Sequence, residues 1–253
     1  MNFSNDVMQN KILIPVTSVL ILIFFNVKIN SQSLGFGCLG LTGGFGGAVY
    51  QSYKADGLNA YLRSLEKAPE DFKYSIGYRV GVNFFRASWE NGFILTAKGY
   101  YQALSKTEKS SDMLADGSSN SLNLDLKNWG VGIDFGYAIT NYFSWKIIDG
   151  AVHFNNVMLT NTINSPGNTV VEKYKSDAGV ISYSLGTGII VGIIKDYISI
   201  EGLAGYTNLK IENLKSDDGS YFSDILPSAD RDKNFINSGG FTAVLQLNIG
   251  FPL

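Results

Sequence analysis

A glycine motif near the start of the chain has the spacing of a dinucleotide-binding turn. Gly35, Gly37 and Gly40 fit the pattern G-x-G-x-x-G, and Asp56 follows at about the distance where such sites place an acidic residue. That chemistry needs a strand before the glycines and a helix after them. Here a continuous apolar segment precedes them, and four more glycines follow in LTGGFGGAVY, where each costs a helix about 1 kcal/mol. We therefore expect no nucleotide and no other cofactor.

The remaining candidates for catalysis or metal binding are one histidine and three aspartates. His153 lies in GAVHFNNV, and a lipid A deacylase would be expected to carry a serine two residues later, where this chain has Asn155. Asp217, Asp218 and Asp224 lack the ligand series and the terminal glutamate of an EF-hand. We expect no catalytic residue and no bound metal, and we interpret His153 as a lumen or interface side chain.

Composition favours a single β-rich domain. The chain has 253 residues, with 28 Gly, 14 Tyr and 16 Phe but only five Pro, a mixture typical of strands with aromatic surfaces. Its 20 basic and 22 acidic residues nearly cancel, so the charge predicts no nucleic-acid partner. Cys38 is the one cysteine, which excludes an internal disulfide and a cysteine-rich metal site.

The first 33 residues have the pattern of a signal peptide. An apolar run over 12–27 lies between two lysines and is shorter than the 18 or more residues of a typical spanning helix. Ser31 and Ser33 are small residues suited to a cleavage site. The alternative is a retained anchor. We expect export, with 34–253 as the mature domain.

Alternation with period two dominates the mature chain. From Phe72 to Phe84, aromatic and branched residues alternate with small or charged ones, and four later segments repeat the pattern. This is the pattern of a β-strand with one apolar face. We predict eight strands, near 34–50, 72–87, 93–106, 121–138, 142–160, 179–193, 197–212 and 237–251.

The connections between these strands alternate in length. ASWENG, AITN and IIKD are short turns, whereas the other four connections are long and polar, at about 51–71, 107–120, 161–178 and 213–236. This asymmetry predicts an antiparallel up-and-down transmembrane barrel, with short turns in the periplasm and long loops outside. An even strand number also places both termini on the periplasmic side.

The first long loop contains a short helical pattern. Leu58, Tyr61, Leu62 and Leu65 recur at i, i+3, i+4 and i+7, with Asp56 near the start of the segment. We expect a short amphipathic helix that packs on its own loop. The alternatives are a cap over the barrel mouth and a partner-binding element.

Charged residues lie opposite the aromatic row of the predicted strands. A Lys or Arg on the lipid face costs about 2–4 kcal/mol, so the charge-free row is the one expected to meet lipid. A soluble lipocalin-like barrel would have the inverse arrangement with the same period. The many inward Gly, Ser, Asn and charged residues favour the membrane barrel, because they suit a hydrated or ion-paired lumen better than a dry core. We predict that five of these residues form an ion-pair network that plugs the lumen, namely Lys73, Arg79, Lys98, Asp134 and Glu201.

Over residues 34–253, this pattern resembles the eight-stranded outer-membrane β-barrel proteins of Gram-negative bacteria, the OmpA-like and porin-family small barrels. GLNAYLRSLEKAP, after a glycine-rich first strand, is similar to a feature of barrels from Bacteroidetes-type bacteria. The resemblance implies a location in the outer membrane, contact with its lipid and insertion by the barrel assembly machinery. Such barrels commonly finish on an aromatic residue, whereas this chain ends Phe251-Pro252-Leu253, so Phe251 would take that part.

Three functions are compatible with these patterns. The first is a structural or adhesive role without enzymatic activity, in which the four long loops bind an extracellular ligand and the lumen is plugged. The second is a narrow porin-like channel for small solutes or ions, which ranks lower because side chains nearly fill an eight-stranded barrel. The third is a lipid-modifying enzyme of the outer membrane, for which His153 is the candidate to test.

Overall fold

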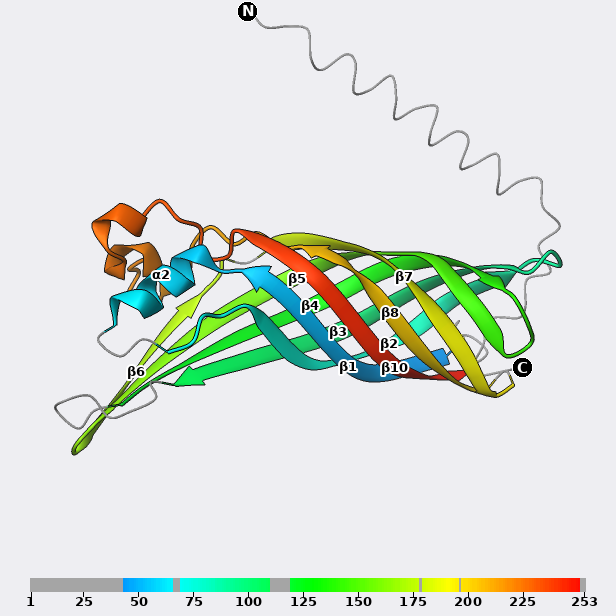
Figure 1. Cartoon of the computed structure of the whole chain (residues 1–253), viewed down its shortest axis with the longest axis horizontal. Helices are drawn as coiled ribbons and strands as arrows, with labels where there is room; N and C mark the ends of the chain where they lie inside the picture. Colours follow the sequence, from blue (N-terminus) through cyan, green and yellow to red (C-terminus); the bar gives the residue numbers. More distant parts are fainter. Residues whose placement is uncertain (1–42, 66–68, 110–118, 178, 196, 251–253) are drawn as a thin grey trace, which may run out of the picture.

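Eight strands of the chain close into an antiparallel barrel (Figure 1). The computed structural model describes residues 43–65, 69–109, 119–177, 179–195 and 197–250. Consecutive barrel strands pair with each other, and β1 closes against β10. The predicted eight-stranded barrel is thus confirmed, and its strands are β1 (Gly43–Lys54), β2 (Tyr74–Ser88), β3 (Phe93–Lys109), β4 (Ser119–Ala138), β5 (Phe143–Ser165), β7 (Val180–Ile194), β8 (Ile198–Asn208) and β10 (Ser238–Gly250).

The two ends of the barrel differ. The three short connections lie at one end together with Gly43 and Gly250, and we call this the turn end (Figure 1). The opposite end, which we call the loop end, carries the helices and the long connections. Short and long connections therefore occupy opposite ends, as the sequence predicted.

The first strand extends further than expected at its loop end. β1 covers Gly43–Lys54 of the described residues, whereas the sequence predicted a strand over 34–50, of which residues 34–42 lie outside the described part. The signal-peptide pattern and the glycines of the nucleotide-like motif lie outside the described residues. Within β1, a Cβ on Gly47 would collide with the Leu245 carbonyl and the backbone of Gln246. Glycine there allows close approach of the two strands that close the barrel.

One predicted loop is instead a hairpin. β5 continues past the barrel to Ser165, turns at Gly167 with φ +85°, and pairs with β6 (Asn168–Lys175). A two-residue strand, β9 (Lys215–Ser216), adds to the end of β6. The loop expected over 161–178 is therefore wrong. The sequence did not reveal β6 because most of this strand is exposed on both faces, so its residues do not alternate between apolar and polar.

The predicted helix of the first long connection is present as α2 (Asp56–Ser64). It packs on its own loop, where the Asn59 side chain bonds both backbone groups of Phe72. It also packs on the connection before β10, since Gly57 N donates to Asn234 O at 3.0 Å and the Tyr61 and Phe222 rings lie 5.4 Å apart. α2 therefore joins the 3-10 helices η2 (Phe222–Ile225) and η3 (Ser228–Asp230) at the loop end (Figure 1). No described helix is long and apolar enough to cross a membrane.

An apolar cluster fills the lumen beneath α2. We call it the loop-end core. The sequence-based expectation that inward residues could not fill a dry core is therefore wrong for this half of the barrel. Its strand members include Val49, Leu104, Leu122, Leu124, Leu126, Val157, Leu159, Leu203 and Val244, and α2 and the connections add, among others, Leu58, Leu62, Phe72, Phe222 and Phe235.

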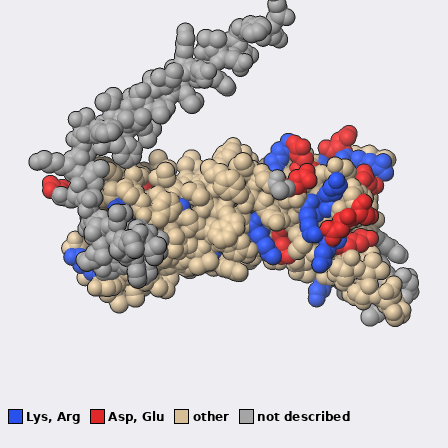
Figure 2. Space-filling model, turned by 180° about the vertical axis from the view of Figure 1, so that it is seen from behind, with Lys and Arg blue, Asp and Glu red and all other residues tan. Residues whose placement is uncertain are grey.

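The outer surface carries a continuous apolar belt. Along β4, Trp129, Val131 and Ile133 are 65%, 52% and 58% exposed. From Trp129 to Tyr137 the strand rises roughly 20 Å along the barrel axis, at about 3.3 Å per residue and a tilt of about 40°. Figure 2 shows this uncharged band on one face of the molecule, with Lys, Arg, Asp and Glu gathered at the loop end. Exposed aromatic residues border the belt on both sides, with Phe84, Tyr142, Trp145 and Tyr197 toward the turn end and Tyr78, Trp129, Phe154, Tyr183, Tyr206 and Phe241 toward the loop end.

Candidate functional site

Six charged side chains occupy the turn-end half of the lumen, and we call them the charged cluster. Each is at most 6% exposed, and together they come from five strands, β2, β3, β4, β5 and β8. Three are basic and three are acidic, so their formal charges balance. The members are Arg79, Lys98, Asp134, Lys146, Asp149 and Glu201.

Lys146 is the centre of the charged cluster. Its Nζ lies 3.2 Å from Asp134 Oδ2, 3.3 Å from Asp149 Oδ2 and 2.5 Å from Glu201 Oε1. Lys98 bonds Asp149 and lies 3.7 Å from Asp134 Oδ2. Two lysines thus bridge three carboxylates that would otherwise repel one another in a confined space, and Arg79 supplies the third positive charge of the cluster.

Arg79 joins the cluster through a neutral residue. Its Nε donates to Gln246 Oε1 at 2.8 Å, and Gln246 Nε2 donates to Glu201 Oε2 at 3.1 Å. The guanidinium also lies 5.6 Å from the ring centre of Phe45 and 5.3 Å from that of Tyr100. Phe45, Arg79 and Tyr100 form an aromatic layer across the lumen, where cation–π contacts hold the positive charge.

The structure brings together four of the five residues predicted for the lumen network. Arg79, Lys98, Asp134 and Glu201 all belong to the charged cluster. Lys73 does not, because it precedes β2 and is exposed, while Phe72 is buried in the loop-end core. The alternation of inward and outward side chains along β2 therefore does not hold before Tyr74, where the strand begins.

Sequence reasoning missed Lys146 and Asp149, although both are central. They lie three residues apart, which would normally place them on opposite faces of a strand. A register shift around Ile147 and Ile148, in the pairing of β5 with both β4 and β7, puts both side chains in the lumen. The slip of apolar parity at this isoleucine pair was the available signal, since a bulge there changes which residues face inward.

His153 lies in a row of three polar side chains across β4, β5 and β7. Its Nε2 is 2.9 Å from Ser184 Oγ, and its Nδ1 is 3.3 Å from Asn128 Oδ1. This is the order of groups found in an activated serine nucleophile. The adjoining cavity, however, holds about 20 Å³, which accommodates about one water molecule and no acyl or phosphoryl substrate.

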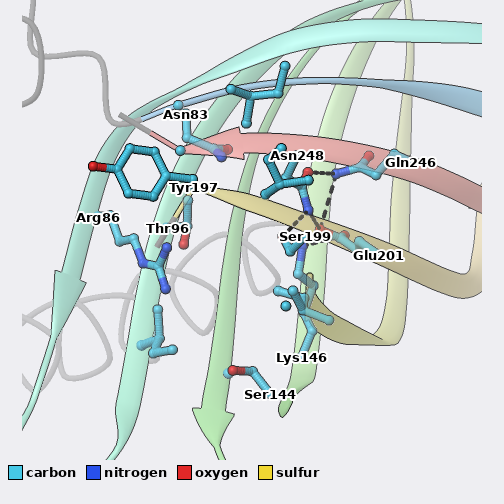
Figure 3. A pocket seen from close by; sticks show the side chains of 18 of the residues that line it. Asn83, Arg86, Thr96, Ser144, Lys146, Tyr197, Ser199, Glu201, Gln246 and Asn248 are labelled. Carbon is cyan, nitrogen blue, oxygen red and sulfur yellow. Dashed lines mark hydrogen bonds and ion pairs between the residues drawn. The ribbon is translucent and has the colours of Figure 1, made fainter. Parts of the chain in front are cut away.

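A larger polar cavity opens at the turn end, and we call it the vestibule (Figure 3). Its volume is about 160 Å³. Lys98, Lys146, Asp134 and Glu201 line its inner end, so the charged cluster lies between the vestibule and the aromatic layer. Polar residues line its walls, among them Asn83, Arg86, Thr96, Ser144, Tyr197 and Asn248.

The aspartates of the last long connection make local contacts rather than a metal site. Asp217 Oδ1 pairs with Lys175 Nζ at 2.9 Å, and Asp224 Oδ2 accepts from the Tyr221 amide at 2.9 Å. Hydrogen bonds from Ser220 hold the pKa of the exposed Asp218 carboxyl below its usual value. Among the described residues, no group of three or more His, Cys, Asp or Glu side chains is arranged to hold a metal ion.

A groove of about 490 Å³ lies at the loop end, where β6 diverges from β9. Val171, Glu172 and Lys173 line its β6 side. Val170 and Val171 are 43% and 52% exposed on this projecting strand. The groove is therefore open to whatever surrounds the loop end.

Comparison with known proteins finds barrels of this general kind. No family model matches the chain, and no curated protein matches it. Similar solved structures include Ail of Yersinia pestis in complex with the heparin analogue sucrose octasulfate, at 12% identity, 82% coverage of this chain, 96% of Ail and a TM-score of 0.37. Neisserial surface protein A matches at 8% identity, with 83% of this chain and 96% of that protein covered and a TM-score of 0.37. The Escherichia coli outer membrane protease OmpT matches at 10% identity, with 83% of this chain and 94% of OmpT covered and a TM-score of 0.39. Similarities at this level assign no activity.

Proposed function

We propose that this chain is an outer-membrane barrel with a sealed lumen, which acts as a structural or adhesive protein through its loop end. The observation that carries the proposal is the filling of the lumen by three successive layers. The charged cluster comes first from the turn end, the aromatic layer follows, and the loop-end core closes the lumen beneath α2. A side-chain-filled lumen is what an eight-stranded barrel is expected to have.

The apolar belt supports membrane insertion. Its exposed residues would lie against lipid, while the charged cluster is inside, where no lipid reaches it. The two aromatic borders match the girdles of outer-membrane barrels, and the short turns would face the periplasm. The barrel assembly machinery would be the partner for insertion, following the expected export signal.

Cell fractionation and gel mobility test the membrane placement. We expect the protein in the outer-membrane fraction, with different migration before and after boiling, because a folded barrel resists detergent until it is heated. Recovery in the soluble fraction would overturn the proposal. A form that migrates identically before and after boiling would also count against it.

Planar-bilayer recording tests the sealed lumen against the channel alternative. We expect no stable conductance from the purified barrel, because three layers of side chains block the path. The Glu201→Gln variant keeps the shape of a cluster member and removes its charge. A stable conductance that changes in this variant would favour the porin-like alternative.

Adhesion is tested at the loop end, where Val170 and Val171 are exposed beside the groove. We expect a variant with both valines replaced by Asp to lose attachment of expressing bacteria to host cells or matrix while keeping its heat-modifiable mobility. Lys54→Ser, at the loop end of β1, is the control and should attach like the parent. Unchanged attachment of the valine variant would exclude this surface.

A further inference from the structure

The vestibule is a dead-end polar cavity that the sealed-barrel proposal does not use. It opens at the turn end and stops at the charged cluster (Figure 3). Whatever enters must therefore leave by the same mouth. Such a cavity suits binding rather than passage.

The charges around the vestibule do not balance. The three bases and three acids of the charged cluster cancel, and Arg86 and Lys195 line the vestibule in addition. The described lining contains no acidic residue besides Asp134 and Glu201, and both of these already bond to Lys146. The potential inside the vestibule is therefore positive, and a narrow low-dielectric wall strengthens it.

Arg86 faces the vestibule because of a register shift in β2. The pairing of β2 with β3 shifts between Asn83 and Phe85, so Phe84 and Phe85 are both exposed on the outside. Arg86 consequently takes the inward side, and Figure 3 shows its side chain at the mouth near Thr96. Bulges of this kind redirect individual side chains at barrel rims.

The donors of Arg86 are free within the part of the chain that the structure describes. No ion pair or side-chain hydrogen bond joins its guanidinium to another described residue. The hydroxyl group of Thr96 on β3, which lies directly opposite Arg86 in the β2–β3 register, also makes no side-chain hydrogen bond to another described residue and lines the vestibule. Thr96 is only 8% exposed, so its hydroxyl is a buried donor aimed at a polar cavity.

We propose that the vestibule binds a small anion, a carboxylate or a phosphate, at Arg86 with the hydroxyl group of Thr96, its direct partner in the β2–β3 register. A guanidinium offers paired donors that match both of these oxyanions. Lys98 and Lys146 at the inner end are balanced by their carboxylate partners, so the excess positive charge is that of Arg86 and Lys195. A cation would meet the excess positive charge and only two carboxylates, both already engaged. That the ligand comes from the periplasm rests on the proposed orientation, whereas binding itself does not.

Calorimetric titration of the folded barrel in detergent tests the site. Inorganic phosphate and acetate are titrated separately, which distinguishes the two oxyanions. We expect saturable binding of one anion per barrel by at least one of them. Arg86→Gln should weaken it about tenfold, as expected for loss of one charge-assisted contact. Thr96→Val, which keeps the side-chain shape, should weaken it by about threefold.

The control is Arg63→Gln on α2, since Arg63 is a surface arginine paired with Asp71 at the opposite end of the barrel. It should bind the anion like the parent, and each variant should keep heat-modifiable mobility. Absence of saturable binding by both anions, or equal affinity in the parent and Arg86→Gln, would overturn the proposal. Because the parent protein is titrated first, misfolding of a variant cannot hide a missing site.

Discussion

The two halves of the lumen have opposite chemistry although the same strands build both. Toward the turn end, the inside of the barrel is charged and polar while the outside is apolar. Toward the loop end, the inside is the loop-end core and the outside is polar. β4 shows the exchange directly, because Leu122, Leu124 and Leu126 point inward before Asn128 does, and exposed Trp129 begins the outer belt.

The proposed membrane placement accounts for this exchange. A wall in lipid is stabilised by apolar residues outside, which leaves polar residues for the lumen. A wall in water has the reverse preference, because the hydrophobic effect drives apolar residues inside. The loop-end half is therefore built like a soluble domain, with α2 as its cover, and the turn-end half like a membrane barrel. The parity slip between Leu126 and Trp129 marks the boundary rather than a bulge, since the β4 pairing is continuous there.

The largest expected effect comes from breaking the charged cluster. Lys146→Met leaves three buried carboxylates with Lys98 as the remaining lysine among them, and removal of one partner from a buried ion pair costs about 3–5 kcal/mol of unfolding free energy. Urea unfolding in lipid vesicles measures the change. Lys175→Met is the control, because its pair with Asp217 is exposed and is worth at most about 1 kcal/mol. Equal losses in the two variants would contradict the central place of Lys146.

The next effect concerns the loop-end core. Leu124 is 0% exposed, and Leu124→Ala should destabilise the protein by about 2–5 kcal/mol through lost burial and a residual cavity. The damage should be local, so limited proteolysis should cut the connections at the loop end while the membrane half stays protected. A variant with unchanged protease resistance and an unchanged urea midpoint would show that the loop-end core does not stabilise α2 and the connections around it.

The outer surface offers a matched pair on one strand, Val152 and Met158 of β5. Both side chains face outward, Val152 within the belt and Met158 beyond it. Val152→Lys should cost about 2–4 kcal/mol because lipid would surround the charge. Met158→Lys should stay within about 0.5 kcal/mol, as ordinary surface changes do. Urea midpoints in the same vesicles compare the two variants. Similar losses of unfolding free energy would place the lipid boundary elsewhere.

The smallest effect is expected at the Asn128–His153–Ser184 row. A serine-reactive fluorophosphonate should not label Ser184 in the folded barrel, because the cavity beside it holds about 20 Å³. Mass spectrometry of the treated protein checks this. Labelling of Ser184 that disappears in His153→Ala would instead support the hypothesis of a lipid-modifying enzyme.

Much of the barrel could be read from local patterns. The eight barrel strands and the alternation of short and long connections were predictable because period two and turn composition are properties of neighbouring residues. The β5–β6 hairpin was missed because most of β6 is exposed on both faces and shows no alternation. Lys73 was misassigned because the apolar–polar alternation of the sequence starts at Phe72, whereas β2 begins only at Tyr74.

The sequence by itself determined the fold class, the number of barrel strands and which face of the clean strands is apolar. Only the tertiary structure decided how the lumen is closed. Lys146 meets Glu201 across 55 positions of chain, and α2 meets a connection far along the sequence. Such contacts depend on strand register and on single-residue bulges, and one shifted residue reverses which side chains point inward. That sensitivity is why the network was foreseen but its central lysine was not.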